Sequence, residues 1–412
     1  MSTKEFFTVS SLDAVLGLLG DIPQAGFETV SLSESFGRIL AREIVSDIDI
    51  PDFNRSTMDG YAVRAVSTFG ASGGMPALFA VTGEIEMGEP SGIFVKSGEA
   101  VRIPTGGMLP DGADSVVMLE HAEPLDDRTL EVFKSVAPLQ HVIEIGEDLR
   151  RGDTVLSAGQ PVRAQDMGLL AALGMSEAPV FKKPVVAIIS TGDEIVDIHE
   201  TPDRGRLRDI NAYTLTGLIM KSGGIPLYLG IAPDRLDELV QMCREAVSQA
   251  DIILVSGGSS VGARDLTKEA INALPDSGIL AHGISISPGK PTIVARIGEK
   301  AFLGLPGHVA SAMIVFMKVV QPLVERIGGL SERYRGKKEW ARAVLSRNLA
   351  SVQGRSDFVR VRLIREEGRL LAQPVLGKSG LIRTMVHADG LIEIDINSEG
   401  LNKGSVVDVE LI

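Results

Sequence analysis

The most informative residues are short polar segments that directly follow apolar runs typical of buried β-strands. Segment 256–262 (SGGSSVG) follows the apolar run 252–255 and precedes a helical pattern. Glycines at a strand-to-helix turn let backbone N–H groups point toward an anion, and a helix start adds partial positive charge. The segment matches neither G-x-x-x-x-G-K-[ST] nor G-x-G-x-x-G, so P-loop and Rossmann assignments fail. It predicts a phosphate-binding loop, although a tight turn without a ligand explains these residues equally well.

Three carboxylates follow different strands of the same predicted sheet. Glu194 ends the segment 190–194 after the run 185–189, Asp234 follows 226–229, and Asp265 lies just beyond the glycine-rich segment. Acidic side chains repel a phosphate unless a hard cation lies between them, and Mg²⁺ prefers few carboxylates plus phosphate oxygens. Each acid alone is more often a solvated loop residue or a helix cap. The three together predict a metal-assisted phosphate site.

Two further turns carry groups that bind anions. The sequence Ser-Pro-Gly-Lys-Pro at 287–291 presents Lys290, a compact positive charge suited to an oxyanion. An ordinary exposed lysine on a Pro-Gly turn is an equally good explanation of the spacing. His308 follows Pro306 and Gly307 at the start of a helical pattern. It is able to bind an anion, but a lone histidine there is more often a capping or packing residue.

Alternating strand and helix patterns between residues 179 and 328 position these loops. The alternation predicts a mostly parallel sheet covered on both faces, with ligands at the carboxyl ends of its strands. The strands are expected at 185–189, 226–229, 252–255, 292–295 and 301–305, and the helices at 212–221, 236–249, 266–273 and 309–326.

The rest of the chain predicts three more domains. Short β-type runs between glycines and prolines predict a small β domain over 51–145. It is inserted in an elongated, discontinuous N-terminal α/β linker domain, 1–50 and 146–178, with helices expected at 8–20, 33–42 and 164–173. Residues 329–412 carry 14 basic and 11 acidic side chains and read as a β-barrel. The predicted fold class is therefore α/β plus β, with the doubly wound α/β domain over 179–328.

The composition excludes several functional classes. The chain has 412 residues and a net charge of −13, which argues against a nucleic-acid partner. Its single cysteine, Cys243, rules out an internal disulfide, a cysteine zinc cage and an iron–sulfur cluster. We find neither a signal-peptide pattern nor an apolar run long enough to span a bilayer. We therefore expect a cytoplasmic protein without a membrane partner.

Taken together, these segments resemble the molybdopterin molybdenumtransferase family, MoeA and the gephyrin E domain. The most specific block is PDFNRSTMDGYA at 51–62, close to the family pattern P-x-F-D-x-S-x-M-D-G-Y-A. The resemblance covers nearly the whole chain. Further blocks match in order at 102–106, 112–120, 146–148, 190–194, 209–211, 256–265, 288–291, 305–307 and 377–380.

The resemblance implies Mg²⁺-dependent hydrolysis of adenylylated molybdopterin with release of AMP, and insertion of molybdate at the dithiolene sulfurs. It implies that Asp59 and Thr105 of the inserted domain face the site on the partner subunit of a homodimer. Glu194, Asp234 and Asp265 would handle the metal and the attacking water, with Glu194 and Asp265 as metal ligands. Molybdopterin adenylyltransferase and molybdoenzyme-delivery proteins are the expected partners.

The same resemblance assigns a set of positions to substrate binding. Lys290 and Ser379 are the candidates for holding the oxyanion. The complete set of expected substrate-binding residues is Gly192, Asp193, Asp209, Asn211, Ser256, Gly257, Gly258, Ser259, Gly262, Lys268, Lys290, Pro306, Gly307 and Ser379.

Two departures from the family pattern bear on the substrate. The family commonly has lysine where Ser287 stands, and L-P-G-N-P where this chain places His308. These departures remove a cation and add an imidazole near the expected oxyanion site, so tungstate stays an alternative to molybdate as the substrate. A non-catalytic molybdopterin-binding scaffold, and a protein sharing only the α/β domain as in pterin adenylyltransferases or competence-damage-type proteins, are alternatives from other classes. The 51–62 block and the C-terminal barrel argue against a protein that shares only the α/β domain, and a scaffold is expected to carry an appended interaction linker or second enzyme domain, which this sequence does not show.

Overall fold

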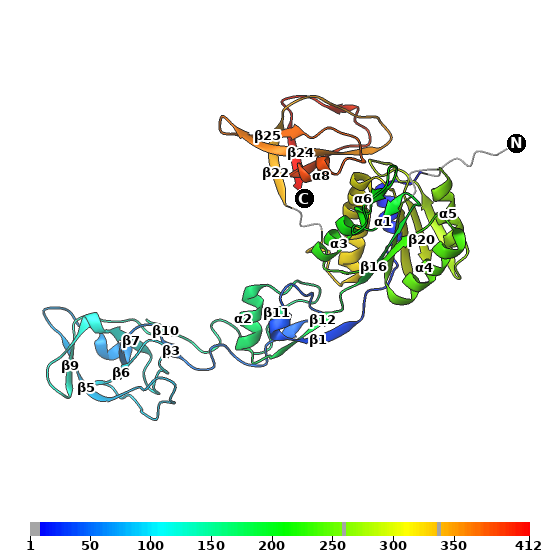
Figure 1. The fold of residues 1–412 in the computed structure, drawn as a ribbon. Helices are drawn as coiled ribbons and strands as arrows, with labels where there is room; N and C mark the ends of the chain where they lie inside the picture. Colours follow the sequence, from blue (N-terminus) through cyan, green and yellow to red (C-terminus); the bar gives the residue numbers. More distant parts are fainter. Residues whose placement is uncertain (1–8, 258–260, 336–338) are drawn as a thin grey trace. The chain divides into compact units, whose positions relative to one another are not determined.

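The computed structural model describes residues 9–257, 261–335 and 339–412, and the side chains of 261–265 lie outside the description (Figure 1). The chain divides into two compact units, which are described separately. The first contains the described residues up to Arg42, Ala158–Ala164 and Glu177–Ile412, and the second contains Glu43–Ser157 and Gln165–Ser176. Among the helices of the described ranges, none is long and apolar enough to cross a membrane.

The first unit is built on a six-stranded sheet in the order β16-β13-β17-β21-β20-β18. The first four strands run parallel, whereas β20 and β18 are antiparallel to their neighbours. This confirms the mostly parallel sheet, to which β18 is an unexpected addition. The strands are β13 (Val185–Thr191), β16 (Ile225–Ala232), β17 (Ile252–Gly257), β18 (Ser277–His282), β20 (Ile293–Ile297) and β21 (Lys300–Leu305).

Helices cover both faces of this sheet (Figure 1). Successive side chains of a strand point to opposite faces, so Val186 and Ile188 enter one core and Ala187 and Ile189 the other. The first core includes α1 (Leu12–Leu18), α3 (Asn211–Lys221), α6 (Val309–Val315), a π-helical turn (Phe316–Val320) and α7 (Gln321–Ile327); the second includes α4 (Leu236–Gln249) and α5 (Val261–Asn272). The predicted doubly wound arrangement is confirmed.

The C-terminal part of the first unit forms a closed five-stranded barrel in the order β24-β25-β22-β28-β26, closed by the pairing of β24 with β26. This confirms the predicted barrel. Its elements are β22 (Trp340–Leu345), β24 (Ser356–Glu366), β25 (Arg369–Pro374), β26 (Gly390–Ile394) and β28 (Val406–Leu411), with the short pair β23 (Leu349–Ala350) and β27 (Gly400–Leu401) and helix α8 (Arg383–Val386).

Backbone pairing and side-chain contacts join the barrel to the α/β domain. Strand β19 (Ile286–Ser287) leaves the α/β domain and pairs in parallel with β24 of the barrel. Lys318, in the π-helical turn, contacts Glu410 of β28 with 2.5 Å between Nζ and Oε2, and the two side chains are only 6% and 9% exposed. The Lys318 ammonium also lies 4.5 Å from the ring centre of Phe358. The barrel is thus fixed by backbone pairing and by a buried ion pair.

The helix predicted at 33–42 is wrong. Strand β1 (Phe27–Ser31) pairs with β12 (Glu177–Phe181), and only a short 3₁₀ turn, Leu32–Glu34, follows it. Gly37 adopts a positive φ of 71°, which ends local helical geometry. Leu40 is fully buried in an extended bridge to Val180. Tertiary pairing that buries Leu40 therefore outweighs the helical pattern.

The second unit contains a six-stranded sheet in the order β7-β4-β6-β5-β9-β8, as the strand-rich pattern predicts. Boundaries of the four predicted domains stay a prediction. The sheet strands are β4 (Gly60–Val63), β5 (Ala77–Glu84), β6 (Glu99–Ile103), β7 (Ser115–Met118), β8 (Ala122–Pro124) and β9 (Thr129–Val132). Two short pairs, β2 (Ile44–Val45) with β11 (Thr154–Leu156) and β3 (Arg55–Ser56) with β10 (Val142–Ile143), accompany helix α2 (Ala164–Ala172).

Candidate active site

The loops after β13 and β16 bring three carboxylates together. Asp193 Oδ1 accepts the backbone N–H of Asp234 at 3.1 Å. Partial burial, together with the negative charges of Asp193 and Glu194, raises the pKa of the Asp234 carboxyl above its ordinary value. Gly192 has φ +136°, and a Cβ there would lie 2.6 Å from Glu194 Oε2, so glycine lets the Glu194 carboxylate fold over the turn. This concentration of negative charge is one that a cation would stabilise.

Asn211, the first residue of α3, connects the ends of β17 and β21. Its Nδ2 donates to Ser256 Oγ at 2.8 Å and to the carbonyl oxygen of Gly307 at 2.9 Å. Asp209 is also buried, and it accepts a backbone N–H from the first turn of α3 at 3.1 Å and the Tyr228 hydroxyl at 3.0 Å. Burial and the neighbouring Asp209 carboxylate raise the pKa of Tyr228. These bonds hold the loops after three strands in one arrangement.

The end of β17 lies against the end of β13. A Cβ on Gly257, whose φ is +157°, would lie 2.2 Å from the carbonyl oxygen of Thr191, so only glycine allows this approach. The predicted binding residues Gly258 and Ser259 lie outside the described residues. Gly262 and Asp265 fall in the part of α5 whose side chains are not described, and Lys268 follows on the same helix, partly buried.

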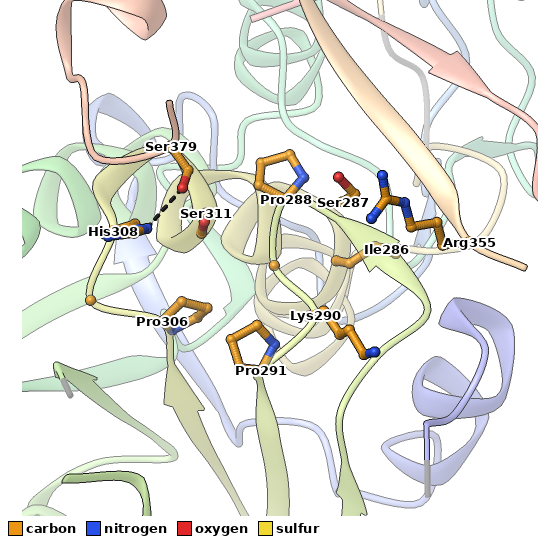
Figure 2. Close-up of a pocket in the computed structure, with 12 residues that line it drawn as sticks. Ile286, Ser287, Pro288, Lys290, Pro291, Pro306, His308, Ser311, Arg355 and Ser379 are labelled. Atoms are coloured by element: carbon orange, nitrogen blue, oxygen red, sulfur yellow. Dashed lines mark hydrogen bonds between the residues drawn. The ribbon is translucent and has the colours of Figure 1, made fainter. Parts of the chain in front are cut away.

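The turns at 287–291 and 306–308 line a pocket of about 270 Å³ (Figure 2). Lys290 and Arg355 give it two cationic side chains, and none of its lining residues is acidic. Arg355 comes from the barrel side because β19 pairs with β24 next to it, and Arg355 Nε lies 3.1 Å from Asp357 Oδ1. The lining residues are Ile286, Ser287, Pro288, Gly289, Lys290, Pro291, Pro306, Gly307, His308, Ser311, Arg355 and Ser379.

Lys290, Pro306, Gly307 and Ser379 were assigned to substrate binding from the sequence, and the structure brings all four to this pocket. Arg355 was missed. The signal that could have found it is non-local, because only the pairing of β19 with β24 shows that it lies near the turn at 287–291.

His308 and Ser379 join the two domains at the mouth of this pocket. His308 Nδ1 lies 2.8 Å from Ser379 Oγ, the contact dashed in Figure 2. The carbonyl oxygen of Ser379 also accepts the backbone N–H of Ala310 at 3.0 Å. Gly307 and His308 line a second pocket of about 580 Å³ as well, together with Asn211. The two pockets therefore share the wall formed by Gly307 and His308.

Asp59 and Thr105 lie together in the second unit. The Thr105 backbone N–H donates to Asp59 Oδ1 at 2.8 Å, and this bond lowers the pKa of the exposed Asp59 carboxyl. Gly60 follows directly, and a Cβ there would lie 2.0 Å from the carbonyl oxygen of Val117. The Asp-Gly sequence thus places an ionised carboxylate beside a tightly packed strand. Its role in a site shared between subunits stays a prediction.

The carboxylates near the strand ends are oxygen donors of the kind that bind Mg²⁺. Within the described ranges, no group of three or more His, Cys, Asp and Glu side chains is arranged to hold a metal. Mg²⁺ is usually bound by one or two carboxylates plus water and substrate phosphate oxygens, so it needs no such cage. The oxygen donors of Glu194 and Asp234 suit it, and the pKa of Asp234 is raised by partial burial and by the negative charges of Asp193 and Glu194. The metal-ligand roles of Glu194 and Asp265 stay predictions.

The fold and these pockets define a class: an α/β protein with a C-terminal barrel and a cationic pocket lined by both. Family models match three successive segments of the chain. They describe the MoeA N-terminal region (domain I and II) at 9–174, a probable molybdopterin binding domain at 187–326, and the MoeA C-terminal region (domain IV) at 342–412.

Relatives match nearly the full length. A putative molybdopterin biosynthesis protein of Methanocaldococcus jannaschii is 35% identical over 392 residues, which is 93% of this chain and 92% of the relative. A molybdopterin molybdenumtransferase of Haemophilus influenzae is 34% identical over 390 residues, 93% of each chain. A crystal structure of a molybdopterin biosynthesis MoeA protein from Pyrococcus horikoshii superposes with a TM-score of 0.85 at 36% identity, covering 98% of this chain and 99% of that one. The chain belongs to the MoeA family, which confirms the resemblance.

Proposed function

We propose that this protein is a molybdopterin molybdenumtransferase. It hydrolyses adenylylated molybdopterin, releases AMP and inserts molybdate into the dithiolene. The observation that carries the proposal is the pair of pockets that share the Gly307–His308 wall. One is small and cationic, as a tetrahedral oxyanion requires, and the other is about twice as large and opens beside Asn211 at the strand ends. Two substrates bound there lie next to each other.

The small pocket suits an oxyanion by charge and by hydrogen bonding. The Arg355 guanidinium offers a planar set of donors and the Lys290 ammonium a compact charge. Ser379 contributes a hydroxyl from the barrel, and Ser311, which is buried, adds another from α6. Molybdate and tungstate share the shape and charge that these groups recognise, so tungstate insertion is tested as the alternative substrate.

The carboxylates at the strand ends suit the hydrolytic step. Mg²⁺, held by Glu194 and Asp265, would neutralise negative charge on the phosphate oxygens. Asp234, whose pKa is raised, is the carboxyl best suited to accept a proton from the attacking water, because basicity rises with pKa. Asn211 keeps Ser256 and Gly307 fixed beside that site.

We further propose a homodimer with shared sites, in which Asp59 and Thr105 act at the partner's site. The lowered pKa of Asp59 supports a permanently ionised carboxylate in that role. The substrate requires a molybdopterin adenylyltransferase upstream, and the product requires molybdoenzyme-delivery proteins downstream. Cys243 is buried as a free thiol, which suits a reducing cytoplasm.

The test of the reaction incubates the purified protein with adenylylated molybdopterin, Mg²⁺ and either molybdate or tungstate, and measures AMP and metal bound to the pterin. We expect AMP release to require Mg²⁺. Lys290→Ala and Arg355→Ala should lower metal incorporation more than AMP release, whereas Lys378→Ala, an exposed lysine that does not line the pocket, should change neither. Absence of AMP release by the folded protein would contradict the proposal, and higher incorporation of tungstate would establish the alternative substrate.

The test of the shared site uses mixed dimers. Homodimers of Asp59→Ala and of Asp265→Ala should both be inactive. Random pairing of equal amounts gives about half mixed dimers, each with one intact and one doubly altered site, so activity should return to about a quarter of wild type. No recovery, with mixed dimers present, would mean that Asp59 does not act in trans.

A further inference from the structure

We propose that His308 couples oxyanion capture to proton binding: the protonated imidazole adds a positive charge to the pocket and leaves the Ser379 hydroxyl free to donate to the bound oxyanion. This inference rests on the oxyanion role proposed above for the pocket of about 270 Å³. It makes His308 a residue that sets the affinity for the dianion and the pH range in which capture occurs.

The side chain of His308 neither caps a helix nor packs in a hydrophobic core. His308 is the N-cap residue of α6, but its side chain makes no capping hydrogen bond. The residue is exposed, which excludes a packing role. Its imidazole turns instead toward the barrel, where Nδ1 contacts Ser379 Oγ at 2.8 Å (Figure 2). The two side chains thus form one polar unit at the edge of the pocket.

The direction of that hydrogen bond decides what Ser379 offers to a ligand. A serine hydroxyl has one proton to donate. If Nδ1 of a neutral His308 accepts that proton, only lone pairs of Ser379 remain for the pocket, and they repel an oxyanion. Both nitrogens of the imidazolium are donors, so Nδ1–H then donates to Ser379 Oγ and the hydroxyl proton becomes available to the ligand. The neutral tautomer with its proton on Nδ1 frees the hydroxyl but adds no charge.

The charged side chains that line the two pockets beside His308 are mostly cationic. On the side of the small pocket they are Lys290 and Arg355, and on the side of the second pocket they are Arg206, Arg208 and Asp209. The buried Asp209 carboxylate is already bonded to the start of α3 and to a tyrosine. A dianion in the small pocket supplies the negative charge that stabilises an imidazolium. Proton and oxyanion binding therefore strengthen each other, by the reciprocity of linked equilibria.

The test measures molybdate binding by isothermal titration calorimetry on the full-length protein between about pH 6 and about pH 8, where an imidazole changes charge. We expect the wild-type Kd to rise with pH, by at most about tenfold per unit for one linked proton. His308→Asn, which restores the residue common in the family, should show a flat profile. His387→Asn, which alters the residue directly after α8 and outside the pocket, should keep the wild-type slope. A flat wild-type profile, or an equal slope in His308→Asn, would overturn the inference.

A second measurement counts the protons that bind together with molybdate. Titrations at about pH 7 in two buffers with different ionisation enthalpies report the protons taken up with the ligand. We expect net uptake in wild type and in Ser379→Ala, which keeps the charge of His308, and no uptake in His308→Asn; no uptake by wild type would also overturn the inference. A different result would reject the oxyanion role of the pocket itself: unchanged molybdate affinity in both Lys290→Ala and Arg355→Ala. Weakened binding in those variants with a flat wild-type profile would reject only the proton coupling.

Discussion

The buried pair Lys318–Glu410 offers a sharp test of how the barrel is held to the α/β domain. Replacing Lys318 by Met keeps an unbranched, slightly shorter side chain and removes its charge. The Glu410 carboxylate, at 9% exposure, then stays buried without its cation. The contact between the ammonium and the Phe358 ring, 4.5 Å apart, is lost as well. We therefore expect a strong destabilisation from the single substitution.

The magnitude follows from the burial of both partners. Breaking a buried pair by removing one partner costs about 3–5 kcal/mol, because an uncompensated charge remains. A loss of about 3 kcal/mol shifts the unfolding equilibrium more than about 100-fold. Replacing both partners by apolar residues of similar size is often neutral or stabilising. Lys318→Met with Glu410→Leu should therefore recover most of the stability lost in either single variant.

The assay is a double-mutant cycle from denaturant unfolding of the full chain, followed by near-UV and far-UV signals because several domains are present. Arg342→Met is the matched control, since Arg342 pairs with Asp408 of the same strand β28 at the surface, with side chains 79% and 62% exposed. We expect that control to change stability by less than about 1 kcal/mol. If Lys318→Met lowered the free energy of unfolding no more than this control, the buried pair would not be desolvated. If the double variant stayed as unstable as the single variants, the unpaired charge would not be the cause of the loss.

Three further predictions concern the site loops and the inserted sheet. The raised pKa of Asp234 means that the folded state binds this proton more tightly than the unfolded state, so stability is lost as pH rises above the ordinary value of 3.8. Asp234→Asn should melt at a higher temperature than wild type at about pH 7, and the difference should vanish toward pH 3.8. Asn211→Ala should cost about 1–3 kcal/mol in denaturant unfolding and lower AMP release about tenfold, because a buried and a part-buried acceptor lose their donor; unchanged turnover would contradict that role. Gly60→Ala places a Cβ 2.0 Å from a carbonyl oxygen and should lower the free energy of unfolding by about 1–3 kcal/mol. In the same denaturant unfolding experiment the control Gly73→Ala, whose Cβ meets nothing within 4 Å, should leave stability unchanged.

Regular patterns allowed much of the α/β domain to be predicted. The helix expected at 236–249 has those bounds in the structure, because its amphipathic pattern and its burial agree. The strands at 185–189 and 252–255 were found because both are buried on two faces and read as continuous apolar runs. Their loops were then expected at one edge of the sheet, as a parallel order requires.

Features that depend on contacts distant in sequence could not be predicted. Strand β18 was missed because its exposed and half-buried residues give no continuous apolar run. Arg355 carries no motif, and its place in the pocket follows from the pairing of β19 with β24. The bridge from Asn211 to Ser256 and Gly307 joins the start of α3 to the ends of β17 and β21, which no local pattern connects.

The small pocket belongs to neither domain alone, and this has a consequence for the reaction. The α/β domain supplies Lys290 and His308, while Arg355 and Ser379 come with the barrel. A barrel displaced by even an ångström would separate the two cations and break the 2.8 Å contact between His308 and Ser379, while the carboxylates beside β13 and β16 stay in place. Loss of the ion pair between Lys318 and the barrel should therefore weaken oxyanion binding before it affects hydrolysis of the adenylylated substrate. Metal incorporation and AMP release, measured side by side on Lys318→Met below its melting temperature, distinguish this from a general loss of fold, which would lower both together.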